Sequence, residues 1–360
     1  MTAIIPGHAP RVALAALGFA TFTAAAETLE EAWRAGLAND QRLVAAQHRE
    51  GAADAALSAA RAGHYPSVSL GTTASRWRDT PAFDFSAAGM PAAMPLFSGN
   101  SFTLANAQVS LPLYSGGAIG ANVAAATATL DNQARAAEAL RQDVKLAVAE
   151  AYVGVLSAQS ALAVARANTA SLDAHARDVE DMRRAGQVPT NDYLAAAVTL
   201  ADATQRELQA ANALEIANAV YNRRVGRPFD APVTLDPLDQ PLGALTAATS
   251  LDELVSAAKE TRAELAGLTA AAEALDARAT AARAARRPQL AVNGGYAFLE
   301  NDFLTREDYW FVALGLRWSF FDSGQTRHAI ANFRRQSEAA RAERTDLAAG
   351  VELDVRRAFA

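Results

Sequence analysis

The chain has 360 residues, a net charge of −6 at pH 7 and no cysteine. Its length would allow two ordinary domains, but alanine dominates long stretches and only 7% of the residues are aromatic, which is not typical of a compact α/β enzyme. Without cysteine there can be no disulfide, thiolate metal site, thiol nucleophile or cysteine-linked lipid, and the mild acidity offers no basic surface for nucleic acid.

Residues 1–26 have the pattern of a secretory signal peptide. Arg11 supplies the positive charge, residues 12–22 are an apolar run, and alanines 24–26 form an A-x-A cleavage site. A short buried helix is the alternative interpretation. No other segment reaches about 18 consecutive apolar residues, so we predict an exported chain without a transmembrane helix.

A helix and two strands are predicted next. Thr28 stands three residues before Glu31, which is the capping-box spacing of a helix start. A helix ends before Pro66, because a proline biases the preceding residue towards extended backbone. Strands are predicted at about 67–77 and 102–114.

A very long helix is predicted from about 118 to 185. The sequence contains no proline between residues 118 and 188, and nearly 70 residues would make a rod of roughly 100 Å. A plain coiled-coil hairpin would explain this region equally well.

The turn after this helix is marked by glycine and proline. Gly186 is a natural helix stop and Pro189 prevents continuation of the first helix. Thr190 or Asn191 can cap a second long helix, predicted at about 191–225.

The second half of the chain repeats the first. Residues 28–43 align with 250–265 at an offset of 222, and Gly117 aligns with Gly324 at an offset of 207. The domain prediction is a first repeat at 27–226, an irregular linker with four prolines at 227–249, and a second repeat at 250–360 with strands at about 289–299 and 309–321.

The second repeat is shorter than the first. If both are complete units, the second should end near residue 226 + 207 = 433, so we expect the chain to lack its last ~70 residues and to be unable to assemble as it stands. A degenerate repeat is the alternative.

Residues 309–321 alternate between apolar side chains and small or polar ones. Trp310 and Trp318 lie eight residues apart, about 26 Å along a strand, which is typical of an apolar band between aromatic girdles. Phe320 and Tyr296 extend this lipid-facing set. A half-buried sheet on a soluble core is the alternative. Four strands cannot close a barrel and an open lipid-facing sheet is not tolerated, so transmembrane strands would require several chains.

The duplicated helix–strand–strand–long-helix units resemble the TolC-type outer-membrane efflux family, over residues 28–360. The resemblance includes the strand-to-helix turns with Gly116, Gly117, Ser323 and Gly324. It implies an α+β membrane protein: a homotrimer whose four strands per chain form a 12-stranded β-barrel in outer-membrane lipid, continued by a long α-helical periplasmic tunnel.

The resemblance also implies a function and partners. The chain would be the passive exit duct of a tripartite efflux or type I secretion system of a Gram-negative bacterium, fed by an inner-membrane pump, of the ABC or resistance-nodulation-division type, through a periplasmic adaptor. Residues Gly186, Gln187, Val188, Pro189 and Thr190 would form the tip that contacts the adaptor. Asp192 matches a gating latch, although an ordinary first-turn acid is an equal alternative.

No catalytic constellation is visible. The five histidines are scattered, and none lies three or four residues from another. We therefore expect no enzyme activity, no metal, no cofactor and no nucleic acid. The alternative function is a soluble periplasmic helical-hairpin adaptor or scaffold, and a third is an exported enzyme. The absence of cysteine favours the secretion-type branch of the family over the acylated branch.

Overall fold

The computed structural model describes residues 26–79, 82–83, 89, 94–95, 100–238, 250–300 and 305–359. The chain divides into two compact units, one of Met1–Asn39 with Val144–Pro241 and one of Asp40–Asp143 with Leu242–Ala360. The boundary between the two units lies inside the longest helix, between Asp143 and Val144, so the units do not coincide with the two predicted sequence repeats. The repeats remain a prediction. The predicted signal peptide lies outside the described residues except for Ala26, as do residues 239–249 of the predicted linker.

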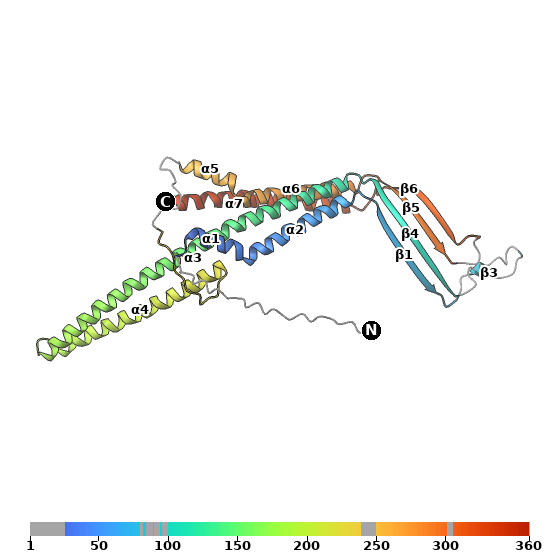
Figure 1. Cartoon of the computed structure of the whole chain (residues 1–360). Helices are drawn as coiled ribbons and strands as arrows, with labels where there is room; N and C mark the ends of the chain where they lie inside the picture. Colours follow the sequence, from blue (N-terminus) through green and yellow to red (C-terminus); the bar gives the residue numbers. More distant parts are fainter. Residues whose placement is uncertain are drawn as a thin grey trace, which may run out of the picture. The chain divides into compact units, whose positions relative to one another are not determined.

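Helices dominate the chain, and Figure 1 labels them with the strands. In chain order the elements are α1 (Leu29–Asn39), α2 (Gln41–Ala62), β1 (Ser67–Arg76), β2 (Ala82–Phe83), β3 (Met94–Pro95), β4 (Ser101–Tyr114), α3 (Ala118–Arg184), α4 (Thr190–Val225), α5 (Leu251–Thr261), α6 (Ala263–Ala284), β5 (Gln289–Leu299), β6 (Asp308–Arg317) and α7 (Gln325–Phe359). By length and composition α3 could cross a membrane, a property to which its many alanines contribute.

The larger sheet has the strand order β1-β4-β5-β6, and all neighbouring strands are antiparallel. Strands β1 and β5 each begin directly after a proline, Pro66 and Pro288, where the backbone is already extended. In the described residues, β1 and β6 are the two edges of this sheet.

The last strand ends earlier than expected. β6 ends at Arg317 rather than near Phe321, because Arg317 pairs with Gln289, the first residue of β5, and Pro288 has no N–H to continue the ladder. The indole Nε1 of Trp318 instead donates to the backbone oxygen of Arg286 at 3.1 Å.

Each strand of this sheet is joined directly to one helix. Helix α2 leads into β1, α3 leaves β4, α6 leads into β5 and α7 leaves β6, all at one end of the sheet (Figure 1). Helices α6 and α7 pack closely through small residues such as Ala272, Ala340 and Ser337, and the Arg341 guanidinium bridges Asp276 between them.

The other unit has a core of α1, α4 and the second part of α3. Val144, Val148, Tyr152, Tyr221 and Val225 are almost completely buried there. Small residues allow the close approach: a Cβ on Gly36 of α1 would lie 2.7 Å from a methyl group of Val148. The rings of Tyr152 and Tyr221 meet edge to face at 6.1 Å.

Glu27 ties the start of the described chain to this core. Its carboxylate accepts from Tyr221 Oη at 2.8 Å and from Arg227 Nη2 at 2.6 Å. Tyr152 Oη lies 2.8 Å from the backbone oxygen of Glu27 and 2.6 Å from that of Asp236. Burial, and then the hydrogen bond to Glu27, raises the pKa of Tyr221, so this phenol stays protonated as a donor.

The first helix of each repeat is broken in the middle, which the sequence analysis did not predict. Asp40 and Arg262 stand at the breaks, 222 residues apart, and both have extended backbone. Asp40 accepts from the backbone N–H of Arg42 at 2.7 Å and so caps α2. The capping box predicted at Thr28 and Glu31 is confirmed by reciprocal hydrogen bonds, and Ser250 and Glu253, at the repeat-equivalent positions, form the same arrangement.

Candidate functional site

One face of the four-stranded sheet is apolar from edge to edge. Directly opposed residues share a face, and the pairing runs from Val68 to Val109, then to Gly294 and Val312. The apolar face consists of Val68, Leu70, Ala107, Val109, Leu111, Leu290, Val292, Gly294, Tyr296, Trp310, Val312, Leu314 and Leu316.

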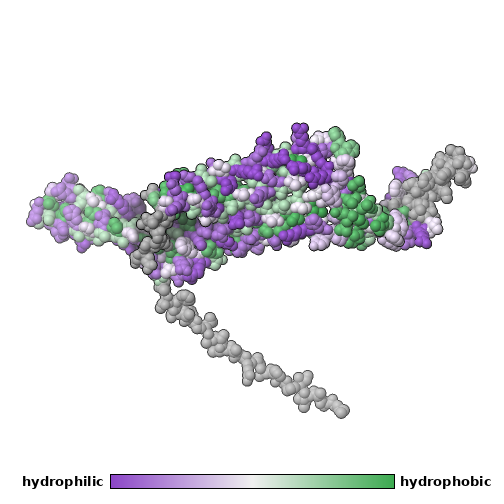
Figure 2. All heavy atoms as spheres, turned by 90° about the horizontal axis from the view of Figure 1, so that it is seen from above, coloured by the Kyte–Doolittle hydropathy of each residue, from purple (hydrophilic) through white to green (hydrophobic). Residues whose placement is uncertain are grey.

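Large side chains of the apolar face are open to the surroundings of the chain. Leu70 is 84% exposed, Trp310 is 76% exposed and Leu316 is 68% exposed. Figure 2 shows hydrophobic side chains gathered over the sheet. Soluble monomers rarely expose so extensive an apolar surface, so this face requires lipid or protein against it.

The opposite face of the same strands is more polar. It carries Asn106, Gln108, Ser110 and Asn293, and Ser110 Oγ donates to Asn293 Oδ1 at 2.8 Å. Larger side chains on this face are Leu104, Leu299, Tyr309 and Phe311. The ring of Phe311 lies over Gly295, the directly opposed residue of β5.

Tyr296 and Trp310, both expected at the lipid-facing girdle, are direct partners in the ladder. Trp318 and Phe320, expected at the other end of the band, meet edge to face at 6.4 Å just beyond β6. Their role in a lipid girdle remains a prediction.

The two strand-to-helix turns have the same backbone conformation. Gly116 and Gly117 have φ of 67° and 93°, and the repeat-equivalent Ser323 and Gly324 have φ of 50° and 90°. At Gly116 a side chain is also sterically excluded, because a Cβ would lie 2.8 Å from the backbone oxygen of Ala284.

The residue before each turn caps the following helix, a feature that the sequence analysis missed. Asp322 accepts from the backbone N–H groups of Gly324 and Thr326 at 3.1 and 2.9 Å. Ser115, 207 residues earlier, accepts from the N–H of Ile119 at 3.3 Å. The hydrogen bonds of Thr326, and then that of Gly324, lower the pKa of Asp322. The sequence signal for these caps is that Ser and Asp, both common helix-capping residues, occupy repeat-equivalent positions 115 and 322.

Basic side chains gather where helices meet the sheet. Arg61, Arg283, Arg286, Arg287, Arg317 and Arg327 lie within a few residues of the strand or helix ends there. Between residues 277 and 299 there is no acid, and between 309 and 337 Asp322 is the only one. This end of the sheet is therefore positively charged in a chain that is acidic as a whole.

The tip of the long hairpin, residues 186–190, belongs to the other unit. Gly186 has φ of 74°. The backbone N–H of Gln187 donates to the backbone oxygen of Met182 at 2.8 Å, and α3 ends with this hydrogen bond. The expected capping by Thr190 or Asn191 is wrong: Pro189 is the N-cap of α4, and no side chain caps that helix. Val188 is half-buried, whereas the other four tip residues are exposed.

Charged side chains form ion pairs in the hairpin next to the tip. Glu180 accepts from Arg183 Nε at 2.7 Å and from Arg184 Nε at 3.1 Å, and the hydrogen bond of Arg183 lowers the pKa of the Glu180 carboxyl. Arg183 also lies 5.4 Å from the ring centroid of Tyr193. Asp192 is exposed in the first turn of α4, and no ion pair of its side chain is found among the described residues.

In the part of the chain that the structure describes, no group of three or more His, Asp or Glu side chains is arranged to hold a metal ion. The candidate functional features described above are the apolar face, the turns and the tip.

The model of the outer membrane efflux protein family matches residues 34–221. No curated protein matches the chain significantly. Among solved structures, a membrane protein from Pseudomonas aeruginosa is similar with a TM-score of 0.74 and 19% identity, over 92% of this chain and 73% of that one.

Two further channels show the same fold. The outer membrane protein VceC from Vibrio cholerae has a TM-score of 0.73 at 14% identity, over 89% of this chain and 75% of that one. The CmeC outer membrane channel of Campylobacter jejuni has a TM-score of 0.71 at 14% identity, over 95% and 76%. The helix-rich architecture with its four-stranded antiparallel sheet is thus that of these channels, and by its match over more than half its length the chain belongs to the outer membrane efflux protein family.

Proposed function

We propose that the chain is the outer-membrane exit duct of a tripartite efflux or type I secretion system. The observation that carries this proposal is the continuous apolar face that crosses all four strands, with a polar face behind it. In a barrel, lipid would cover the first face and water the second.

The proposal includes a homotrimer. Because β1, β4, β5 and β6 alternate in direction, β6 of one copy joined to β1 of the next continues the antiparallel order. Three copies give the 12 strands that the family resemblance implies, and closure removes both unpaired edges.

The proposed partners are a periplasmic adaptor at the tip and an inner-membrane pump. The exposed backbone around Gly186 and Pro189 offers a compact surface to an adaptor hairpin. Asp192 is a candidate latch for a closed entrance, and a second candidate role is the stabilisation of the N-terminus of α4 through the helix dipole. Transport is passive, with energy supplied by the pump.

A soluble periplasmic scaffold is the competing function. It would leave Leu70, Trp310, Leu316 and Phe320 in water, which costs roughly 25 cal/mol for each Å² of apolar surface. The shared fold with outer membrane channels also supports the duct over the scaffold.

The test is the native mass of the protein extracted from outer membranes, after expression from the gene read to its natural stop, combined with conductance in a planar bilayer. A detergent-stable trimer that conducts ions is the expected result. A monomer that remains soluble in the periplasm would overturn the proposal.

A further inference from the structure

In the described strands of the four-stranded sheet, the more polar face carries a single charged side chain, that of Arg317. This residue alternates with Ala313, the direct partner of Asn293, and therefore shares the face of that asparagine. The other charged residues of these strands are Arg76 and Asp308. Both alternate with residues of the apolar face and lie at the far end of the sheet. Arg317 is thus the one charge on an otherwise neutral surface.

The charge of Arg317 is not neutralised by its own chain. Arg317 is the last residue of β6 and is exposed, and its guanidinium forms no ion pair or hydrogen bond within the part of the chain that the structure describes. Asp322, the nearest acid in the sequence, accepts from the backbone N–H groups of the following helix. Residues 85–130, which include β4, contain no charged side chain.

A cavity of about 360 Å³ adjoins Arg317 on the same face. Ala291 and Gly315, which are direct partners in the ladder, belong to its lining, and their small size leaves the space open. No acidic residue lines this cavity among the described residues. Its polar lining residues are Ser110, Ser115, Gln289, Asn293 and Arg317.

Asn293 presents a second donor to this cavity. Ser110 Oγ donates to Asn293 Oδ1 at 2.8 Å, and this hydrogen bond orients the amide so that its nitrogen is on the other side. Nδ2 of Asn293 has no hydrogen-bond partner among the described residues, and a Cβ on Gly315 would lie 3.3 Å from it. The glycine therefore keeps this N–H group accessible. A guanidinium and an amide N–H are both donors, so the group that satisfies them is an oxyanion.

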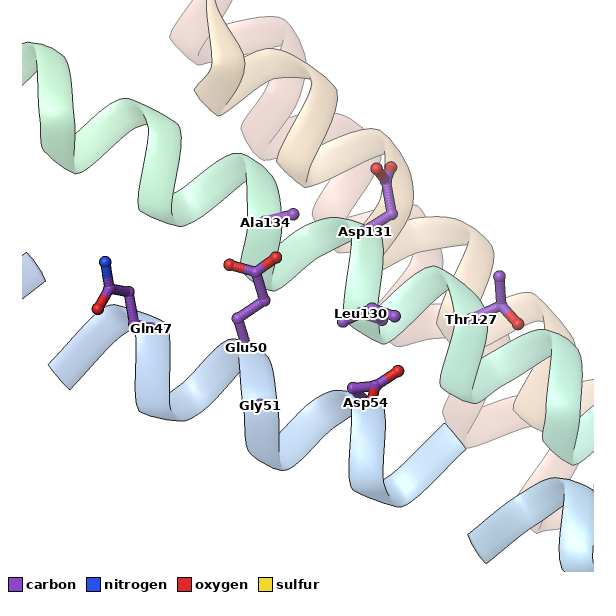
Figure 3. A pocket seen from close by; sticks show the side chains of 8 residues that line it. All are labelled: Gln47, Glu50, Gly51, Asp54, Thr127, Leu130, Asp131 and Ala134. Atoms are coloured by element: carbon purple, nitrogen blue, oxygen red, sulfur yellow. The ribbon is translucent and has the colours of Figure 1, made fainter. Parts of the chain in front are cut away.

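Another cavity of the same unit has the opposite charge. It measures about 590 Å³ and lies between α2 and α3, where Glu50, Asp54 and Asp131 belong to its lining (Figure 3). The second repeat has Arg341 where this lining has Ala134, at the offset of 207. Among the described residues no basic side chain lines this cavity, so it would repel an oxyanion. Of the two cavities, the one beside Arg317 suits an anion.

We propose that Arg317 and the adjoining cavity form a binding site for oxyanions in the wall of the duct, and that the duct favours cargo with carboxylate or phosphate groups. The inference rests on the proposed function and deepens it, because a barrel with lipid against the apolar face has the more polar face towards its water-filled interior. Identical copies would place their Arg317 side chains at one level of the interior. A ring of arginine side chains in a pore favours anions over cations.

The first test is the ion preference of the full-length protein in planar bilayers. A gradient of KCl gives the ratio of chloride to potassium permeability. Arg317→Gln should lower this ratio at least about twofold, and Arg317→Lys should keep most of it. The matched control is Arg76→Gln, which removes the same charge from the opposite face of the same sheet and should leave the ratio unchanged. The effect should be largest near about 0.1 M salt, because higher salt screens the charge more strongly.

The second test adds sodium phosphate or sodium acetate at constant ionic strength and measures the chloride conductance. A decrease with either anion is expected for the natural protein and for Arg76→Gln, and it should be lost in Arg317→Gln. The anion that acts shows whether phosphate or carboxylate groups are preferred. Asn293→Leu removes the amide donor and keeps the charge, so it should weaken the response to the anion without changing the permeability ratio.

The fraction of detergent-stable oligomer shows that each variant assembles, and Arg317→Gln should not change it because the guanidinium has no partner among the described residues. An open channel whose permeability ratio and anion response are the same in the natural protein and in Arg317→Gln would overturn the inference and leave the proposed function intact. Equal changes in Arg317→Gln and Arg76→Gln would also overturn it. A protein that forms no conducting oligomer would overturn both proposals.

Discussion

Gly295 of β5 lies directly opposite Phe311 of β6, and a Cβ on Gly295 would lie 2.7 Å from a ring carbon of Phe311. The glycine makes room for an aromatic ring on the more polar face of the sheet. Its neighbour Gly294 is on the apolar face, where the nearest atom to an added Cβ is 3.6 Å away. Adjacent glycines of one strand thus have different steric constraints.

Gly295→Ala should destabilise the sheet by roughly 1–3 kcal/mol, because the ring and the oxygen of Ala107 at 3.1 Å must both yield. Gly294→Ala is the matched control, with an expected cost below about 1 kcal/mol. The measurement is the temperature at which the folded band is lost in detergent gels. Equal melting of the two variants would show that the ring moves aside freely.

The two turns allow a reciprocal exchange. Gly116→Ser should destabilise by roughly 1–3 kcal/mol because its Cβ would meet Ala284 and Arg287, although the backbone matches that of Ser323. Ser323→Gly should stabilise by up to about 1 kcal/mol, because it removes a side chain from a left-handed conformation. Thermal unfolding of both variants checks that the two stability changes have opposite directions. The control is Gly120→Ala, in open space within α3, which should leave stability unchanged or increase it.

Asp322 should make stability depend on pH. Its folded pKa is lowered, so its contribution is present above the unfolded value of about 3.9 and is lost as pH falls through the lower folded value. At pH 7, Asp322→Ala should therefore unfold at a lower temperature than the natural protein. The difference between the two melting temperatures should become smaller below about pH 4. Ser115→Ala changes the repeat-equivalent residue, which has no titrating group. The difference between its melting temperature and that of the natural protein should not change with pH. A constant difference for both variants would contradict the linkage.

The Glu27 network should stabilise the unit to which it belongs. Tyr221→Phe removes a buried donor to a carboxylate and should cost roughly 1.5–3 kcal/mol in unfolding free energy. Tyr65→Phe, at an exposed position, should cost less than about 0.5 kcal/mol. Chemical denaturation of both variants provides the comparison, and similar losses would assign the effect to something other than the network.

If Asp192 is a latch, Asp192→Asn should raise the resting conductance in planar bilayers. Asp202→Asn, another exposed acid of α4, should leave the conductance unchanged. If the Asp192 carboxylate only interacts favourably with the dipole at the N-terminus of α4, Asp192→Asn should lose about 0.3–1 kcal/mol of stability and should conduct like the natural protein.

Much of the fold was accessible from the sequence because its signals are local. Alternation of side chains predicts a strand, a proline predicts where β1 and β5 begin, and the absence of proline predicts the uninterrupted α3. The capping boxes at Thr28 and Ser250 also depend only on residues three positions apart.

Only the tertiary structure decided which residues oppose one another. The ladder places Val68, Val109, Gly294 and Val312 on one face and fits Phe311 over Gly295, and no local pattern specifies such pairs. The breaks at Asp40 and Arg262, where the backbone is extended, also have no proline or glycine at the break to mark them. Likewise Asp54 and Asp276 occupy equivalent positions, but their surroundings differ because the helix packed opposite offers alanine to one and arginine to the other.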